Sequence, residues 1–160
     1  MENNQKNKRR IWLTTYVPLI IWILVVLGLG SGMGSMNETS RIIRPLLQFL
    51  FPSTSIETLT IYHGYVRKFA HFAEYAVLAF LAFRALFPFK HKYAMAFGVA
   101  AFVATVDEFN QSLNPSRTSS IWDVALDLAG AASAILVLAL IAIRRRSKRR
   151  NTPATDSETR

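Results

Sequence analysis

The chain has 160 residues, no cysteine and a formal net charge of +9. This length fits one domain, and the lack of cysteine excludes disulfides, thiol catalysis and cysteine-based metal sites. Half of the residues are apolar, and they lie in long runs separated by short basic or polar pieces. That arrangement is typical of a membrane protein built from helices and differs from the pattern around a soluble core.

The positive charge lies beside the apolar runs. Lys6, Lys8, Arg9 and Arg10 precede the first run, and six Lys or Arg residues within 144–150 follow the last one. Basic blocks next to hydrophobic spans set the orientation of membrane helices. We therefore interpret the charge as an orientation signal and expect no nucleic-acid partner.

The first apolar run covers residues 11–29 and follows a basic head at 1–10. Its 19 residues carry no charge, which is long enough for a membrane span. A cleaved signal peptide is the alternative, because small residues follow at 30–35. Signal-peptide apolar regions usually have about 7–15 residues, so a retained helix is favoured. The glycines after this run indicate a flexible helix exit, since they do not form a phosphate loop.

A polar connection at 35–60 contains one amphipathic piece, residues 41–51. This piece is too short and too charged to span a membrane. It could lie on the membrane surface as a helix that ends at Pro52, or form a loop packed over the other helices. The sequence leaves both interpretations open.

Three further helices are predicted. The second helix runs from about residue 60 to a stop at Pro88, and the fourth carries small residues near Gly130 that favour close helix contact. The tail at 144–160 is basic and predicted to be disordered. We expect an all-α membrane bundle within residues 11–143. The four predicted transmembrane helices are 11–29, 66–87, 93–112 and 121–143.

Charge also predicts the orientation of this bundle. With four spans, both termini lie on one side of the membrane together with the turn at 89–92. All three segments are rich in Lys and Arg, so that side is cytoplasmic. The connections at 31–65 and 114–120 then face outside. The expected location is the cell membrane, crossed several times.

Arg67, His71 and Glu74 interrupt the second apolar run at i, i+4 and i+7, so they share one helix face. Inside a membrane each of these groups needs an inward-facing partner. Counting about 1.5 Å per residue from the cytoplasmic ends places Glu74, Asp107 and Asp127 at roughly 20, 22 and 26 Å. The hydrocarbon layer is about 30 Å thick. Three helices are therefore predicted to bring ionisable groups to one level in its outer half.

Spacing within the other helices agrees with one shared polar site. Asp107 and Gln111 are four residues apart, and so are Asp123 and Asp127. Five acids of this set face three cations, which leaves a formal charge of −2 when His71 is neutral. Such a balance requires shared protons, a charged His71, or a bound cation or cationic ligand. The acids are Glu74, Asp107, Glu108, Asp123 and Asp127, and the cations are Arg67, Lys68 and Arg117.

Three motifs cross these helices in order: Arg67-Lys68-x-x-His71-Phe72-x-Glu74-Tyr75, then Asp107-Glu108-x-x-Gln111, then Pro115-x-Arg117 followed by Asp123 and Gly130. Together they resemble the VanZ-like family of small membrane proteins, from about residue 11 to residue 143. That family takes its name from a protein that raises resistance to the glycopeptide antibiotic teicoplanin. The segment after Gln111 departs from the family pattern, because it lacks the aromatic residue often found there.

Two interpretations of the polar set remain open. A buried ion-pair network could fix the register of the helices, or the groups could form a ligand or reaction site that opens to the outside. Their number at one depth favours the site. Arg67 and Arg117 could grip a phosphate or carboxylate of a cell-envelope lipid or a lipid-linked glycopolymer precursor, with proton transfer by imidazole or carboxyl groups. The resemblance implies that such a site could contribute to teicoplanin resistance. The candidate acids and bases are His71, Glu74, Asp107, Glu108 and Asp123, and the candidate ligand-binding residues are Arg67, Lys68, Tyr75, Gln111, Arg117 and Asp127.

One imidazole and many carboxylates would also suit a divalent cation, with Mg²⁺, Mn²⁺ or Ca²⁺ preferred over Zn²⁺. The remaining alternative is a non-enzymatic membrane protein that acts through a partner, with its C-terminal basic block on anionic lipid. Whether the chain is an enzyme stays open at this point. His63 and His91 are interpreted as interfacial residues.

Overall fold

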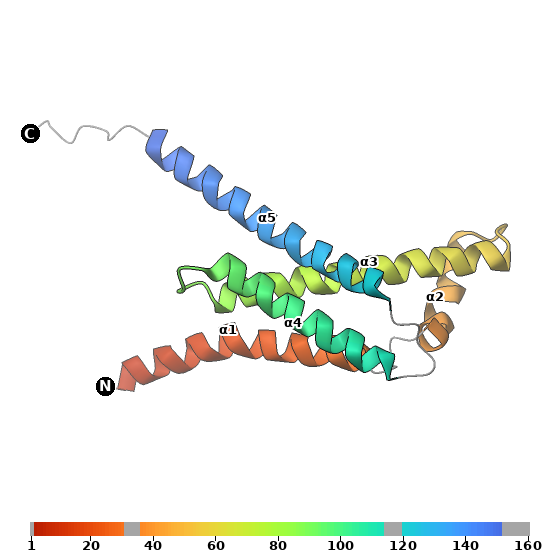
Figure 1. The fold of residues 1–160 in the computed structure, drawn as a ribbon, viewed down its shortest axis with the longest axis horizontal. Helices are drawn as coiled ribbons and strands as arrows, with labels where there is room; N and C mark the ends of the chain where they lie inside the picture. Colours follow the sequence, from red (N-terminus) through yellow and green to blue (C-terminus); the bar gives the residue numbers. More distant parts are fainter. Residues whose placement is uncertain (1, 31–35, 114–119, 152–160) are drawn as a thin grey trace, which may run out of the picture.

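The computed structural model describes residues 2–30, 36–113 and 120–151. Within those ranges the chain is all-α, as predicted, and contains no strand. The two ends of the bundle differ: α2 lies at one, and the start of the first helix and the end of the last helix lie at the other (Figure 1). The helices are α1 (Glu2–Gly28), α2 (Met36–Leu50), α3 (Ile56–Ala85), α4 (Lys92–Ser112) and α5 (Ile121–Asn151).

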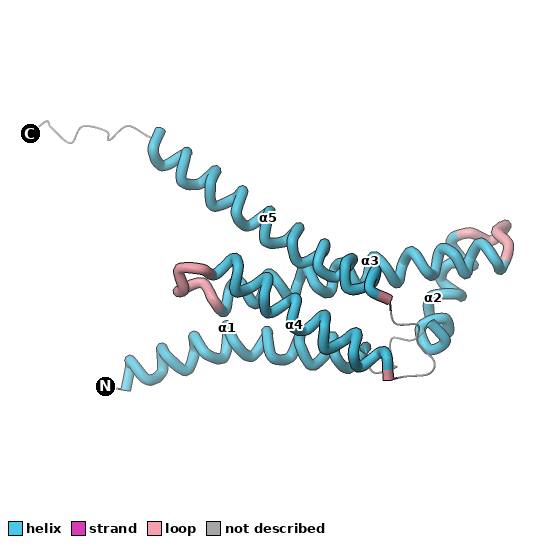
Figure 2. The backbone as a smooth tube through the Cα atoms, viewed as in Figure 1, coloured by secondary structure: helices cyan, strands magenta, loops and turns pink. Residues whose placement is uncertain are grey.

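Helix α3 is the centre of the fold, because it contacts each of the other four helices (Figure 2). Its start is capped by Ser55, whose hydroxyl oxygen accepts a hydrogen bond from the amide of Thr58 at 3.3 Å. Such a cap satisfies one of the free amides at a helix N-terminus. The helix ends where the chain turns through Pro88 into α4, since proline cannot continue the helical hydrogen bonding.

The core of the bundle consists mostly of small side chains. Tyr75 and Leu78 are its large members, and alanines fill the remaining contacts between α3, α4 and α5. Small residues let helix backbones approach closely, which is how membrane helices gain packing energy. The buried alanines are Ala79, Ala82, Ala85, Ala96, Ala100, Ala104 and Ala131.

Helix α1 is an integral part of this bundle. Val26 is 1% exposed and belongs to the core. The indole nitrogen of Trp22 donates to the backbone oxygen of Glu74 at 3.0 Å. Nearer the N-terminus, the guanidinium of Arg84 donates to the backbone oxygen of Thr14 at 2.7 Å. The first apolar run therefore packs against α3 along much of its length.

Helix boundaries differ from the predicted ones at both ends of the chain. The basic head is helical from Glu2, and α5 continues through the basic segment to Asn151. The disorder predicted from residue 144 is therefore wrong up to 151, and residues 152–160 lie outside the described part. Lys and Arg are good helix formers, so a basic stretch without Gly or Pro extends an existing helix. The second helix also begins earlier than predicted, at Ile56.

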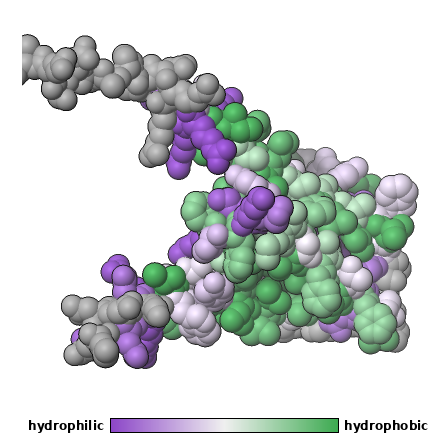
Figure 3. Space-filling view, turned by 60° about the vertical axis from the view of Figure 1, so that its left-hand side comes forward, coloured by the Kyte–Doolittle hydropathy of each residue, from purple (hydrophilic) through white to green (hydrophobic). Residues whose placement is uncertain are grey.

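In the described part of the chain, two helices are long and apolar enough to cross a membrane by length and composition: Gln5–Gly28 within α1 and Ile121–Lys148 within α5. That number is smaller than the four predicted spans. In α3 and α4 the charged residues of the polar set interrupt the apolar run, as Glu74 and Asp107 do. The surface is nevertheless largely apolar over the body of the bundle, with hydrophilic residues near the chain ends (Figure 3).

The amphipathic piece at 41–51 forms most of α2. This helix contacts α3, and Leu47 is 7% exposed at the interface. On its outer side Ile42, Leu46 and Phe49 remain exposed, by 74%, 52% and 82%. Each of the two interpretations of this segment is therefore correct in part. The segment is a helix with an exposed apolar stripe, as in the first, and it packs over the bundle, as in the second. It ends at Leu50, shortly before Pro52.

Candidate functional site

His71 lies where α3, α4 and α5 meet. Its Nδ1 atom is 3.6 Å from the Oδ1 atom of Asp127 on α5 and 3.9 Å from a carboxylate oxygen of Glu74, one turn along α3. Ligand atoms of His71, Asp107 and Asp127 all lie within 4.8 Å of one another. We call these three residues the HDD cluster. The cluster joins three consecutive helices, because His71 is on α3, Asp107 on α4 and Asp127 on α5.

The two carboxylates of the HDD cluster are deeply buried, since Asp107 is 2% exposed and Asp127 is 4% exposed. Two negative charges this close in a low-dielectric interior repel each other strongly. His71 alone supplies at most one compensating charge. The cluster therefore needs shared protons or a cation to be stable in this geometry.

Asp107 is oriented by its own helix. The side-chain amide of Gln111 donates to Oδ2 of Asp107 at 2.8 Å, which is the contact expected from their four-residue spacing. Gln111 is 2% exposed, so this hydrogen bond forms in the interior. It fixes the carboxylate plane and leaves Oδ1 facing the end of α1.

Gly30, in the π-helical turn that follows α1, lies against the carboxylate of Asp107. The helix continues through Leu29 and Gly30 as a π-helical turn, and a Cβ atom added at Gly30 would collide with Oδ1 of Asp107. Glycine is thus required for the backbone to approach the carboxylate. The sequence analysis interpreted this glycine as part of a flexible exit, and the structure gives it a packing role at the cluster.

Gly130 on α5 plays the corresponding role beside His71. A Cβ atom at Gly130 would collide with the backbone oxygen of Phe72, the residue that follows His71 on α3. Only glycine lets α5 come this close. Because Asp127 lies one turn before Gly130, the same close approach carries its carboxylate to His71. The predicted close helix contact at Gly130 is therefore present.

Tyr75 lies beside the cluster with its side chain 0% exposed. Its hydroxyl group and Oδ1 of Asp127 are buried and have no hydrogen-bond partner among the described residues. Tyr75 interacts electrostatically with Asp107 and Asp127. Buried polar groups are nearly always hydrogen-bonded in folded proteins. These two groups mark a place where a further donor, water or ion is expected.

A cavity of about 230 Å³ adjoins the cluster between α1, α2 and α3. His71 and Glu74 form one end of it, and Arg67 and His63 line it further along α3. Its other walls are mostly apolar. They include Val26, Leu29, Ile43, Val66 and Ala70.

His63 is a site residue that the sequence analysis placed at the interface. It is 4% exposed and its Nε2 atom lies 3.0 Å from the hydroxyl of Thr39 on α2. Burial lowers the pKa of His63, and the charges of Arg67 and Arg44 lower it further. A signal for this residue was present, because His63, Arg67 and His71 follow one another at four-residue spacing.

The other candidates separate into three groups. Arg67 lines the cavity and forms no ion pair with a described acid, and Lys68 points to the exposed side of α3. Glu108 and Asp123 are half-buried and stand outside the HDD cluster. Arg117 lies in 114–119, outside the described residues. The sequence analysis expected Arg67 and Lys68 to balance the negative charge of the buried acids. Among the described residues, neither forms an ion pair with one of those acids.

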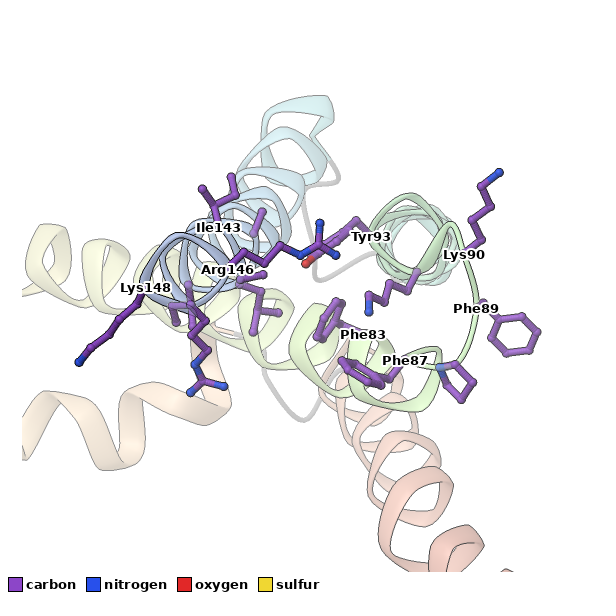
Figure 4. Close-up of a pocket in the computed structure, with 15 residues that line it drawn as sticks. Phe83, Phe87, Phe89, Lys90, Tyr93, Ile143, Arg146 and Lys148 are labelled. Carbon is purple, nitrogen blue, oxygen red and sulfur yellow. The ribbon is translucent and has the colours of Figure 1, made fainter. Parts of the chain in front are cut away.

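A larger cavity of about 1350 Å³ lies elsewhere, between the α3–α4 turn and the end of α5 (Figure 4). Aromatic and basic side chains line it, and the ammonium group of Lys92 lies 3.8 Å from the ring centre of Phe87. Phe83 is twelve residues beyond His71, or roughly 18 Å along the helix. The two cavities are therefore separate sites at different levels of the bundle.

The VanZ/LLP1 family model matches residues 13–142. The chain belongs to the VanZ/LLP1 family. This match covers the whole HDD cluster and both cavity-forming stretches of α3, and it confirms the resemblance seen in the three sequence motifs. Together with the two apolar helices, it makes the chain a VanZ-like membrane protein. Comparisons with curated proteins and with solved structures found no match.

Proposed function

We propose that the chain crosses the cell membrane four times, through α1, α3, α4 and α5, with both termini in the cytoplasm. The start of α1, the end of α5 and the α3–α4 turn lie at the same end of the bundle (Figure 1). The basic residues Lys90, Arg146 and Lys148 gather around that end (Figure 4). Basic residues beside spans are retained on the cytoplasmic side, which supports this orientation.

In this orientation α2 lies at the outer face of the membrane. Its exposed stripe of Ile42, Leu46 and Phe49 suits burial in the headgroup region, as in interfacial amphipathic helices. The cavity between α1, α2 and α3 then opens at the outer leaflet. The HDD cluster lies just below it.

The function that the geometry supports best is binding of a phosphate-bearing cell-envelope lipid, or of a lipid-linked envelope precursor, in this cavity. The observation that carries the proposal is Arg67, which lines the cavity without an acidic partner among the described residues. A guanidinium group binds phosphate oxygens through two parallel hydrogen bonds. At about 230 Å³ the cavity is smaller than a drug-sized site and suits a headgroup, with the lipid chains left in the membrane.

Modification of the bound lipid would use the polar end of the cavity. His71 and Glu74 lie together there, and an imidazole paired with a carboxylate can move a proton to or from a reacting oxygen. Arg67 would hold the phosphate about one helical turn away. This arrangement supports proton transfer as the chemistry of the site, if the bound lipid is also transformed.

The test compares two neighbouring cations on α3. Full-length protein is purified in mild detergent as wild type, Arg67→Gln and Lys68→Gln, and the retained lipids are identified by native mass spectrometry. Arg67→Gln should retain at least about tenfold less phosphate-bearing lipid, which corresponds to about 1.4 kcal/mol of lost binding free energy. Lys68→Gln should match the wild type, because its side chain faces away. Equal retention by all three proteins would contradict the proposal.

A glycopeptide phenotype is the second part of the proposal. If the retained lipid is an envelope precursor, expression of the wild type in a teicoplanin-susceptible host should lower susceptibility. Arg67→Gln should restore susceptibility at equal protein abundance in the membrane. Lys68→Gln serves as the matched control for expression and charge.

The alternative is a structural ion network in a non-enzymatic membrane protein that acts through a partner. The pairing of His71 with both Glu74 and Asp127 favours it, since such contacts also fix helix register. Substitution of Glu74→Gln separates the two proposals. Normal folded yield with lost lipid retention supports the binding site, whereas a parallel loss of both supports the network.

A further inference from the structure

The spacing of the HDD cluster matches that of ligands around one metal ion. In a tetrahedral site with metal–ligand distances of about 2.1 Å, ligand atoms lie about 3.4 Å apart. The observed distance between Nδ1 of His71 and Oδ1 of Asp127 is 3.6 Å, and Asp107 completes a group within 4.8 Å. Each of the three ligands comes from a different helix, so the geometry is produced by the fold and not by local sequence.

A second observation points to a ligand at the same place. Oδ1 of Asp127 and the hydroxyl of Tyr75 are buried without a hydrogen-bond partner among the described residues. Asp127 is 4% exposed and Tyr75 is 0% exposed, so bulk water does not compensate for the missing bonds. A buried carboxylate oxygen left in this state is costly. A bound cation would remove that cost directly.

We propose that His71, Asp107 and Asp127 bind one divalent cation of the Mn²⁺ or Zn²⁺ class. Two carboxylates and a neutral imidazole give the site a charge of −2, which one divalent ion neutralises. Ca²⁺ requires six to eight oxygen ligands, and this donor set is too small for it. An imidazole nitrogen also favours first-row transition metals over Mg²⁺. The sequence analysis preferred Mg²⁺, Mn²⁺ or Ca²⁺ over Zn²⁺; this proposal keeps Mn²⁺, drops Mg²⁺ and Ca²⁺, and adds Zn²⁺ because the three ligands include an imidazole.

Neighbouring residues have roles that fit this site. Gln111 donates a hydrogen bond to Oδ2 of Asp107. In metal sites, residues that do not touch the ion orient its carboxylate ligands through hydrogen bonds of this kind. Gly30 leaves room for Oδ1 of Asp107 at the end of α1. The hydroxyl of Tyr75 can act as a further ligand or donate to a water on the ion. His71 also lines the α1–α2–α3 cavity, so an ion on it would face the cavity occupant.

The cation proposal stands independently of the lipid proposal, because metal binding is measured without any lipid ligand. Full-length protein in detergent is stripped with a chelator, dialysed and titrated with Mn²⁺, and free Mn²⁺ is followed by electron paramagnetic resonance. We expect one saturable equivalent, displaced by Zn²⁺. Asp107→Asn and Asp127→Asn should each weaken binding at least tenfold. Glu57→Gln, which removes an exposed acid at the start of α3, should change the affinity less than threefold.

Thermal unfolding supplies a second measurement. Mn²⁺ at about 100 times its dissociation constant should raise the melting temperature of the wild type by about 5–11 °C. Glu57→Gln should show the same rise. If Asp127→Asn fails to fold, the wild-type titration decides alone. Absence of a saturable equivalent in the wild type, or wild-type affinity in a folded Asp127→Asn protein, overturns the proposal.

Discussion

Substitution of Gly130 by alanine tests how close packing of α3 and α5 builds the site. The added Cβ atom would collide with the backbone oxygen of Phe72 and lie 2.9 Å from its carbonyl carbon and 3.1 Å from its Cα atom. These are backbone atoms in the middle of α3, so no side-chain rotation relieves the contact. Helix α5 must move away from α3 as a whole.

The cost follows from overpacking in a rigid interior. Inserting a methyl group into a well-packed core typically costs about 1–3 kcal/mol, and a collision with backbone belongs at the upper end. For a protein of this size each kcal/mol lowers the melting temperature by about 2–4 °C, so Gly130→Ala should melt about 6–12 °C lower. Because α5 carries Asp127, the same displacement separates that carboxylate from His71.

The assay is thermal unfolding of full-length protein in detergent, followed by circular dichroism. Gly98→Ala is the matched control, since Gly98 is also a helical glycine but has no atom within 4 Å of an added Cβ. It should gain up to about 1 kcal/mol from helix propensity and should not melt earlier. If Gly130→Ala has the melting temperature of the wild type and Gly98→Ala does not melt earlier, the close approach of α5 to Phe72 does not determine the fold.

Three further predictions follow from other contacts. Gly30→Ala should weaken Mn²⁺ binding at least tenfold while changing the melting temperature less than Gly130→Ala, because its Cβ meets a side-chain carboxylate and not backbone; unchanged Mn²⁺ affinity would contradict this. Ser55→Ala should cost about 1 kcal/mol in thermal unfolding by removing the cap of α3, and Ser55→Asn should retain it. Burial and two nearby arginines lower the pKa of His63 below its usual 6.5. Below pH 6.5 the unfolded state therefore binds a proton that the folded state does not, and the free energy of unfolding should fall. A His63→Gln protein should show a smaller fall between about pH 7.5 and about pH 5.5, and equal falls would refute the assignment.

Much of the site could be predicted because it depends on helical spacing. The four-residue separation of Asp107 and Gln111 predicts their contact, and counting residues from the basic ends placed Glu74, Asp107 and Asp127 at similar depths. His71 lies one turn from Glu74. These are properties of single helices and of the charge pattern. The all-α class follows from the same information.

Other features depend on how helices approach each other, which spacing does not describe. Gly30 lies against Asp107 because α1 and α4 are in contact. No sequence periodicity relates Gly30 to Asp107. The predicted charge compensation is described only for Arg67 and Lys68, because Arg117 lies outside the described residues. Arg67 and Lys68 are adjacent, and adjacent residues point about 100° apart on a helix, so they cannot face the same cluster. Lys68 is accordingly exposed.

The distribution of the HDD cluster over three helices has a consequence for biosynthesis. His71 is made 56 residues before Asp127, which at about 5–20 residues per second is an interval of roughly 3–11 s. During that time α3 presents an incomplete polar face to whatever surrounds it. Mutations in α5 should therefore lower the yield during synthesis in addition to destabilising the finished protein, as Gly130→Ala is expected to do.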